Sequence, residues 1–145
     1  MQAKRRLNLG CGEDYQNDWI NIDKSIDIKC DVRRDVERGL PFEDNSIDEV
    51  YSKFMVEHIK DTVFFWNEVW RVCKPNARVN VLVPDFNSPA AIDFDHKSFW
   101  NTRKFQYLNK DKRGDYTGLE CNFEICDTTT REKGTVLDVV LKVIK

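Results

Sequence analysis

A short strand that leads directly into a glycine turn lies at the start of this sequence. The pattern of residues 6–9 is typical of a strand, and Gly10-Cys11-Gly12 follows it at once. Because glycine has no Cβ, a G-x-G turn lets a ligand approach the backbone closely. In open α/β sheets, ligands bind beyond the carboxyl ends of the strands, which is where this turn lies. The turn therefore indicates an α/β fold with a ligand site after its first strand. The alternative is an ordinary tight turn.

The next predicted strand, Trp19–Asp23, ends in a carboxylate that can accept hydrogen bonds from ribose hydroxyls. Together with the glycine turn, this acid favours a nucleoside ligand, either a dinucleotide or S-adenosylmethionine. The dinucleotide motif has a third glycine where this chain has Tyr15, and its acid comes about 20 residues on, whereas Asp23 follows Gly12 by 11. The segment between Gly12 and Trp19 is also too short for a comfortable helix, so we predict a loop there.

Hydrophobic periodicity predicts the remaining elements of the fold. They are strands at Ile28–Val32, Ile47–Ser52, Arg78–Val83, Leu119–Cys126 and Val136–Ile144, a turn at Pro41–Ser46, a helix from Asp61 or Thr62 to about Cys73, and a helix over 97–108. Alternating strands and helices predict a Rossmann-like α/β fold with a mainly parallel, twisted sheet. The last two strands predict an antiparallel C-terminal β-hairpin, and the helix between the first two strands is expected to be missing. A length of 145 residues predicts a single domain, 1–145.

The charge balance argues against a protein held to nucleic acid by bulk charge. The chain has 23 Lys and Arg against 25 Asp and Glu, a net charge of −2. The charges are unevenly spread, because residues 97–113 carry a basic surplus. The basic side chains there are Lys97, Arg103, Lys104, Lys110, Lys112 and Arg113. This segment is either a solvated helix face or a contact surface for an anionic substrate or partner.

Localisation and redox state follow from what the sequence lacks. No apolar run approaches the roughly 20 residues of a membrane span, and the N-terminal residues have no apolar core typical of a signal peptide. We therefore expect a cytoplasmic protein that does not bind membranes. Five dispersed cysteines are a poor disulfide framework, so we expect reduced thiols. With two histidines and no C-x-x-C pair, no metal site is predicted.

Six longer motifs occur in the order of one known family. They are LNLGCG (7–12), WINID (19–23), DVERGLPFEDNSIDEVYS (35–52), VEHI (56–59), EVWRVCKP (68–75) and VNVLVPDF (79–86). With a looser match at DHKSFW (95–100), the sequence resembles the class I S-adenosylmethionine-dependent methyltransferases, the type 11 group in particular. The resemblance covers about 100 of the 145 residues. It implies S-adenosylmethionine as the cofactor and methyl transfer to a small-molecule or macromolecular acceptor.

The resemblance also implies a set of cofactor-binding residues at the ends of the strands. They are Leu9, Gly10, Cys11, Gly12, Asp23, Lys24, Asp35, Val36, Lys53 and Phe54. The glycine turn would lie beside the amino-acid part of the cofactor, and Asp23 would hold the ribose. Asp35 and Val36 would frame the adenine, while Lys53 and Phe54 would line the methionine end.

Two residues are candidates for a general base at the acceptor. Asp85 follows Pro84 at the end of a predicted strand, and His96 lies in the looser match. The sulfonium methyl is already activated, so positioning the acceptor is the main requirement and a base is optional. The alternatives are that Asp85 is a turn or cap residue and that His96 orients the following helix. The family's E-H pair, Glu57 and His58, usually orders the helix that follows it.

Departures from the family leave a second function open. A helix is expected to be missing after Gly12, Asn76 replaces a usual glycine, and few residues after Phe86 remain for a substrate cap. The alternative is therefore a catalytically reduced methyltransferase-fold binding module that acts through a partner. A nucleotide-dependent enzyme of another class is a third hypothesis, but its Y-x-x-x-K pair is not found near a suitable helix. A second copy could cover the exposed face, so a homodimer is also a hypothesis.

Overall fold

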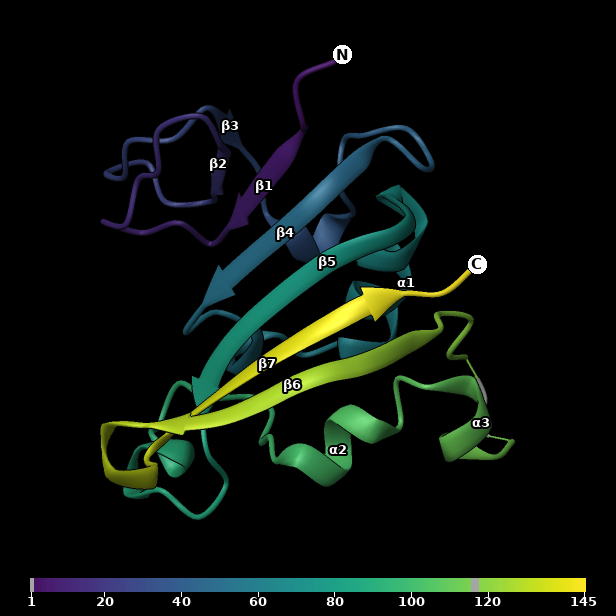
Figure 1. The fold of residues 1–145 in the computed structure, drawn as a ribbon. Coiled ribbons are helices and arrows are strands. Elements are labelled where there is room, and N and C mark those ends of the chain that lie inside the picture. Colours follow the sequence, from purple (N-terminus) through teal and green to yellow (C-terminus); the bar gives the residue numbers. More distant parts are fainter. Residues whose placement is uncertain (1, 116–117) are drawn as a thin grey trace.

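Seven strands form one mixed sheet in the order β3-β2-β1-β4-β5-β7-β6 in the computed structural model, which describes residues 2–115 and 118–145 (Figure 1). The strands are β1 Arg6–Leu9, β2 Ile20–Asp23, β3 Val32–Arg33, β4 Ile47–Lys53, β5 Cys73–Pro84, β6 Phe123–Arg131 and β7 Val136–Val143. Strands β1 to β5 pair in parallel, and β7 pairs antiparallel with both β5 and β6. The predicted Rossmann-like sheet with an antiparallel hairpin is confirmed.

The helices are few and short. They are α1 Thr62–Val72, α2 Thr102–Gln106 and α3 Lys110–Arg113, with single 3-10 turns η1 Val36–Arg38, η2 Val56–His58, η3 Pro89–Ile92 and η4 Glu132–Gly134. The longest, α1, begins as predicted, because the Asp61 carboxylate accepts a hydrogen bond from the Phe64 N–H at 2.9 Å. It ends where Cys73 turns extended and enters β5. Asn76 then takes a left-handed conformation at φ 66°, in place of the usual glycine.

Two predicted elements are shorter or displaced because side chains compete for their backbone groups. The strand predicted at Ile28–Val32 is only β3, Val32–Arg33, since the preceding residues form a turn. The helix predicted over 97–108 is reduced to α2, because Asn101 caps it by accepting from the Lys104 N–H at 2.9 Å. The residues before that cap instead donate their backbone N–H groups to the carbonyl of Glu57.

Strands β6 and β5 also begin at residues other than those predicted. The strand predicted at Leu119–Cys126 begins at Phe123, since the carbonyls of Leu119 and Cys121 accept hydrogen bonds from the buried Arg113 guanidinium. It continues to Arg131, beyond the predicted end at Cys126. Strand β5 starts five residues before the predicted Arg78, because it follows α1 without a loop.

A loop, not a helix, joins β1 to β2, as predicted, and buried amides hold it. The Asn8 side chain donates to the Asp14 carbonyl at 2.7 Å and to the Asn21 amide oxygen at 2.9 Å. That same oxygen accepts the Gln16 N–H, and the Asn21 amide nitrogen donates to the Asp31 carboxylate. Both asparagines are buried. Since buried polar groups are costly unless hydrogen-bonded, this network fixes the loop without helical structure.

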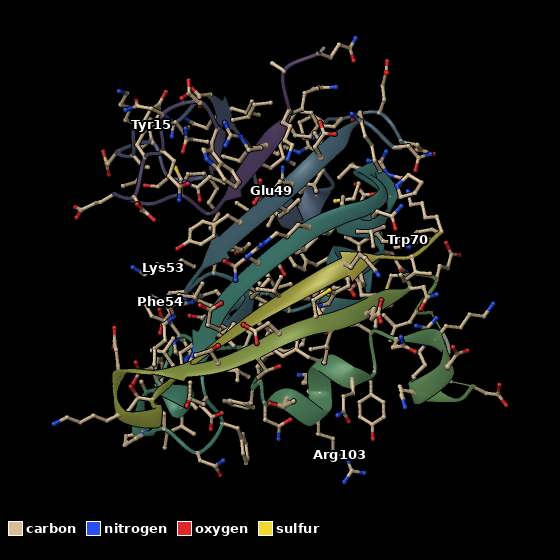
Figure 2. All side chains as sticks on the ribbon, viewed as in Figure 1. Tyr15, Glu49, Lys53, Phe54, Trp70 and Arg103 are labelled. Carbon is tan, nitrogen blue, oxygen red and sulfur yellow. The ribbon has the colours of Figure 1, made fainter. Side chains whose placement is uncertain are left out.

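Only one face of the sheet is covered by helices in the described part of the chain. Figure 1 shows α1 behind β5 and β7, on the side where the strands present buried residues such as Leu7, Val50 and Val81. The opposite side carries polar residues, among them Glu49 and Asn80, and Figure 2 shows Glu49 on this open side. Parallel sheets are normally covered on both faces. Buried and polar residues therefore alternate along the strands of this sheet, as in a sheet with one face exposed to solvent.

Trp66 of α1 lies at the centre of the covered layer. Its ring is 1% exposed and makes edge contacts with Phe65, Trp100, Phe105 and Phe123 at centroid distances of 5.3 to 6.1 Å. Trp70 of the same helix is only partly buried, and its indole N–H donates to the Ile144 carbonyl at 3.0 Å. Trp66 thus joins α1 to α2 and to the hairpin edge.

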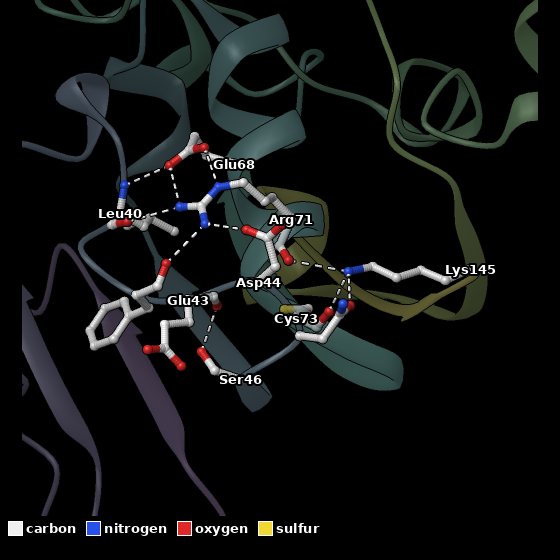
Figure 3. Close-up of polar contacts among 10 residues, drawn as sticks. Leu40, Glu43, Asp44, Ser46, Glu68, Arg71, Cys73 and Lys145 are labelled. Atoms are coloured by element: carbon white, nitrogen blue, oxygen red, sulfur yellow. Dashed lines mark hydrogen bonds and ion pairs between the residues drawn. The ribbon is translucent and has the colours of Figure 1, made fainter.

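An ion-paired arginine ties α1 to the segment before β4 (Figure 3). The Arg71 guanidinium donates to the carbonyls of Leu40 and Phe42, and it pairs with Glu68 at 2.7 Å and with Asp44 at 2.7 Å. Glu68 also accepts the Leu40 N–H at 2.8 Å. This segment follows η1 directly, so the contacts position the predicted adenine-binding residues against α1.

Replacing Glu68 with glutamine is expected to destabilise the protein at neutral pH but not in acid. Hydrogen bonds from Arg71 hold the pKa of Glu68 below its usual value of 4.5, so its contribution is present above that pH and is lost as the pH falls. Partial exposure screens the pair, so we expect a loss of about 1 kcal/mol at pH 7. Urea unfolding of both proteins between pH 7 and pH 3 measures this. An equal difference at both pH values would contradict the charge argument.

Candidate functional site

The order in which the chain adds strands to the sheet reverses at β1, and a ligand site is expected at such a reversal. From β1 the chain proceeds outward to β2 and β3, and then crosses back to β4 on the other side of β1. Ligands of open α/β sheets bind in the crevice at the carboxyl ends of the strands beside such a switch point. A cavity of about 280 Å³ lies there. Its lining residues are Gly10, Gly12, Asp23, Lys24, Arg34, Asp35, Val36, Glu37, Phe54, Met55, His58 and Ile59.

The glycine turn and the acid after β2 form one unit at the mouth of this cavity. Gly10 and Gly12 both have positive φ, at 62° and 50°, which favours glycine. The Asp23 carboxylate accepts the Gly12 N–H at 2.9 Å through one oxygen and the Ser25 N–H at 2.8 Å through the other. Each carboxylate oxygen keeps a further lone pair for a ligand hydroxyl. Asp23 therefore orders the turn and can still hold a ribose.

Most of the expected cofactor-binding residues line this cavity, but Leu9, Cys11 and Lys53 do not. Leu9 and Cys11 are buried beneath the turn, and the Cys11 N–H donates to the Ile22 carbonyl at 3.0 Å. Lys53 lies at the end of β4, where it lines a neighbouring cavity on the open side of the sheet (Figure 2). Asp35 lines the ligand cavity while its carboxylate caps η1 by accepting the Glu37 N–H at 3.0 Å.

Phe54 adopts a backbone conformation that is uncommon for a bulky side chain. Its φ is 53°, and its ring is exposed at the point where β4 ends (Figure 2). Left-handed backbone at a bulky residue is a genuine outlier and clusters at functional sites. The residue lines the ligand cavity and also a second cavity of about 380 Å³ at the ends of β4 and β5.

The second cavity holds the predicted base candidate His96 but not Asp85. Acidic and imidazole side chains line it: Glu57, His58, Asp93, Asp95, His96 and Glu132. Asp85 is absent from the residues lining these cavities, and its carboxylate accepts the Asn87 N–H at 2.9 Å in a turn. This is the turn role that was the alternative for Asp85. Among the residues lining the second cavity there is no lysine or arginine.

Glu57 is the buried acid of this second cavity. Its side chain is 3% exposed, and its Oε2 atom has no hydrogen-bond partner among the described residues. Burial raises the pKa of Glu57 to about 7, the largest cause being loss of hydration. The sequence motif V-E-H-I pointed to these residues, but only as a pair that orders the following helix.

Three basic residues of the segment 97–113 have side-chain contacts within the fold, among them Arg103, which donates to the Tyr107 hydroxyl at 3.5 Å. Arg113 is buried and donates to three carbonyl groups, and Lys104 lies 4.3 Å from the centroid of the Trp100 ring. Burial lowers the pKa of Lys104. The remaining basic residues stay candidates for a contact with an anionic partner. Lys104 and Arg103 also line an apolar cavity of about 430 Å³ beside Trp66.

Comparison with known proteins gives a family pattern and a shared fold. Residues 11–81 match the pattern of a family described as a methyltransferase domain. No curated protein matches the chain in sequence. A protein assigned as an S-adenosylmethionine-dependent methyltransferase from Listeria monocytogenes is 15% identical, with a TM-score of 0.68, over 99% of this chain and 92% of that one.

Two further solved structures have the same fold in different settings. One, at 13% identity and a TM-score of 0.72, belongs to a complex between the Haloferax volcanii Trm112 methyltransferase activator and a proposed methyltransferase, and 99% of this chain covers 84% of it. The other is the [4+2]-cyclase SpnF, at 13% identity and a TM-score of 0.72, with 98% and 75% of the chains covered. At such identities the likeness shows the fold alone. None of the described helices has the length and apolar character to cross a membrane.

Proposed function

We propose, for a chain that has the class I methyltransferase fold and the methyltransferase-domain pattern over residues 11–81, that it transfers a methyl group from S-adenosylmethionine to an acceptor. The observation that carries this proposal is the Asp23–Gly12 hydrogen bond at the switch point of the sheet. It joins the two elements that a nucleoside requires, a turn open to close approach and an acid for the ribose. The family pattern supports S-adenosylmethionine as that nucleoside.

The residues around the 280 Å³ cavity fit this cofactor in their chemistry. Asp23 would accept from the ribose hydroxyls, and Asp35 with the backbone of Val36 would meet the polar edge of the adenine. Apolar side chains of Met55 and Ile59 complete the lining. When bound, S-adenosylmethionine supplies a methyl group already activated by the positive sulfonium. No helix begins after Gly12, so the cofactor carboxylate would lack a helix dipole worth about 0.3–1 kcal/mol.

The acceptor would occupy the second cavity, which shares Phe54 and His58 with the first. His96 is the better placed of the two predicted bases, because it lines this cavity and Asp85 does not. The His96 Nδ1 atom lies 3.2 Å from the Ala91 carbonyl oxygen, an acceptor only. Nδ1 therefore carries the proton of the neutral ring, which leaves Nε2 to accept a proton from an acceptor group. The acidic lining favours a neutral or cationic acceptor over an anionic one.

Replacing Asp23 with alanine is expected to weaken the binding of S-adenosylmethionine and S-adenosylhomocysteine by roughly 1–3 kcal/mol, about 5- to 150-fold in Kd. The variant loses the ribose acceptor and the bond that orders Gly12. Calorimetric titration of both nucleosides, with NAD for comparison, measures the effect. Asp23→Asn keeps one acceptor oxygen and should lose less affinity.

Three outcomes of this titration separate the hypotheses. Absence of heat from both sulfur nucleosides at millimolar concentration would refute the proposed function. Preferential binding of NAD would favour a nucleotide-dependent enzyme of another class. Tight binding of S-adenosylmethionine without turnover of any methyl acceptor would favour the reduced binding module. A homodimer and a cytoplasmic location stay predictions, the first of which light scattering can test.

A further inference from the structure

Two histidines and a buried carboxylate meet in the second cavity although they come from separate parts of the chain. Glu57 and His58 end the turn η2 after β4, and His96 follows η3 after β5. The Glu57 carbonyl accepts the backbone N–H groups of Lys97 at 2.7 Å and Ser98 at 3.0 Å. These bonds fix the segment of His96 against η2. One ligand atom from each of Glu57, His58 and His96 lies within 4.8 Å of the other two.

Both imidazoles have their Nδ1 atoms engaged away from the carboxylate of Glu57. His96 Nδ1 lies 3.2 Å from the Ala91 carbonyl oxygen, and His58 Nδ1 lies 3.5 Å from the Asp95 carboxylate. The Nε2 atoms are thereby left with free lone pairs, and that of His58 lies 4.0 Å from Glu57 Oε1. Histidines that bind metals almost always donate their other ring N–H to a carbonyl or a carboxylate in this way.

The electrostatic surroundings also favour a cation. Glu57 is buried with one carboxylate oxygen unpartnered among the described residues, and a buried charge without a partner is strongly unfavourable. Asp93, Asp95 and Glu132 line the same cavity, and neither lysine nor arginine is among the lining residues. A divalent cation would supply the missing counter-charge.

We propose that Glu57, His58 and His96 bind one divalent cation of the Zn²⁺ type. Two imidazole nitrogens and one carboxylate oxygen are the ligands of catalytic zinc sites, which keep a fourth position open. Bond lengths near 2.1 Å place tetrahedral ligands about 3.4 Å apart, so the three donors must approach one another by about 1 Å. The half-exposed His58 and the carboxylate of Glu57 can move by this amount through side-chain rotation. The open position faces the second cavity.

This site stands independently of methyl transfer, but its role toward an acceptor rests on the proposed function. An oxygen or nitrogen donor of the acceptor would take the open position and be oriented toward the shared residues Phe54 and His58. Lewis acids lower the pKa of the groups that they bind, so in the metal-bound chain the acceptor would need no strong protein base and His96 would act as a ligand in place of a base. The cation would thus select acceptors that coordinate metals.

Zinc titration of the chelator-treated full-length chain tests the site. We expect one Zn²⁺ per chain, and at least about 100-fold weaker binding for His96→Ala and for Glu57→Gln. Asp95→Asn removes the carboxylate beside His58 Nδ1 and the one 4.0 Å from His96 Nε2, and it should weaken binding by about 10- to 100-fold. Asp93→Asn is the matched control, since it lies in the same cavity outside the cluster and should bind zinc as the wild type does. Circular dichroism verifies that each variant is folded.

The free cysteines provide a competing site, and Co²⁺ distinguishes it. Cobalt on nitrogen and oxygen ligands gives visible bands without the near-ultraviolet charge transfer of a thiolate. A thiolate band that disappears in Cys30→Ser or Cys126→Ser, or zinc binding unchanged by both His96→Ala and Glu57→Gln, would overturn the proposal. Titration of S-adenosylmethionine into the metal-free chain is measured separately. Zinc binding without nucleoside binding would retain this site and refute the proposed function, and the reverse result would do the opposite.

Discussion

Alanine in place of Gly10 is expected to destabilise the protein by roughly 2–5 kcal/mol and to abolish measurable binding of S-adenosylmethionine. A Cβ at this position would overlap the Cγ of Met55 and lie 2.8 Å from its Cβ, too close to the backbone for simple rotation to relieve. Overpacking of this kind costs about 1–3 kcal/mol, and a left-handed backbone adds roughly 1–2 kcal/mol. Because Met55 lines the ligand cavity, its displacement also narrows the site.

Gly12 provides the matched control for this variant. Its φ is 50°, close to the 62° of Gly10, but a Cβ there would have nothing within 4 Å. Gly12→Ala should therefore show the backbone cost of roughly 1–2 kcal/mol without the steric one. Urea unfolding and nucleoside titration of both variants measure the difference, with Met55→Ala in the Gly10→Ala background as a partial rescue that removes the Cγ overlap but keeps the Cβ contact. Equal losses of unfolding free energy at the two glycines would contradict the steric argument.

Truncation of Trp66 to alanine is expected to cost about 3–5 kcal/mol of unfolding free energy. The ring is buried among four other aromatic side chains, which cannot close over the space that it leaves. Since net protein stability is commonly only 5–15 kcal/mol, the variant should unfold near or below ordinary growth temperature. Differential scanning calorimetry and urea unfolding measure the loss.

Replacing Trp66 with phenylalanine separates the effect of side-chain volume on stability from the effect of the buried indole N–H. The Trp66 indole N–H has no hydrogen-bond partner among the described residues, so Trp66→Phe removes a buried polar group along with some volume. We expect this variant to lose less than about 2 kcal/mol. A loss as large as that of Trp66→Ala would mean that the indole nitrogen has a partner, such as a bound water.

The presence of the strands and their parallel or antiparallel direction could be predicted because local signals agree there. Gly10 and Asp23 mark the ends of β1 and β2, and the alternating valines of β5 mark a half-buried strand. The predicted boundaries of the strands and helices were wrong where a group distant in the sequence forms hydrogen bonds with the backbone. Arg113 binds the carbonyls before Phe123, and the Glu57 carbonyl binds the backbone N–H groups of Lys97 and Ser98 ahead of α2. Such competition is tertiary, so no sequence window contains it.

The proposed cofactor-binding residues were easier to predict from the sequence than the proposed acceptor cavity. Asp23, Asp35 and Val36 follow consecutive strands, so their meeting at one sheet edge follows from parallel topology. His58 and His96 belong to different turns, and their proximity depends on the hydrogen bonds from the 97–98 backbone to Glu57. A motif that names each histidine separately cannot predict this contact. Asp85 was chosen by position, and its turn role became visible only from its bond to Asn87.

The shortness of β1, β2 and β3 has a consequence for how the ligand and the fold depend on one another. These strands have four, four and two residues, and no described helix lies over the open side of the sheet beside them. The cavity proposed for the nucleoside thus lies on the short strands of the sheet, while the long β5, β6 and β7 form the larger part of it. A bound nucleoside would contact Gly12, Asp23 and Val36 together and so hold the ends of these strands in place. Ordering these strands would then cost part of the intrinsic free energy of nucleoside binding. The rigidity of this sheet edge would therefore rise as more of the chain binds nucleoside.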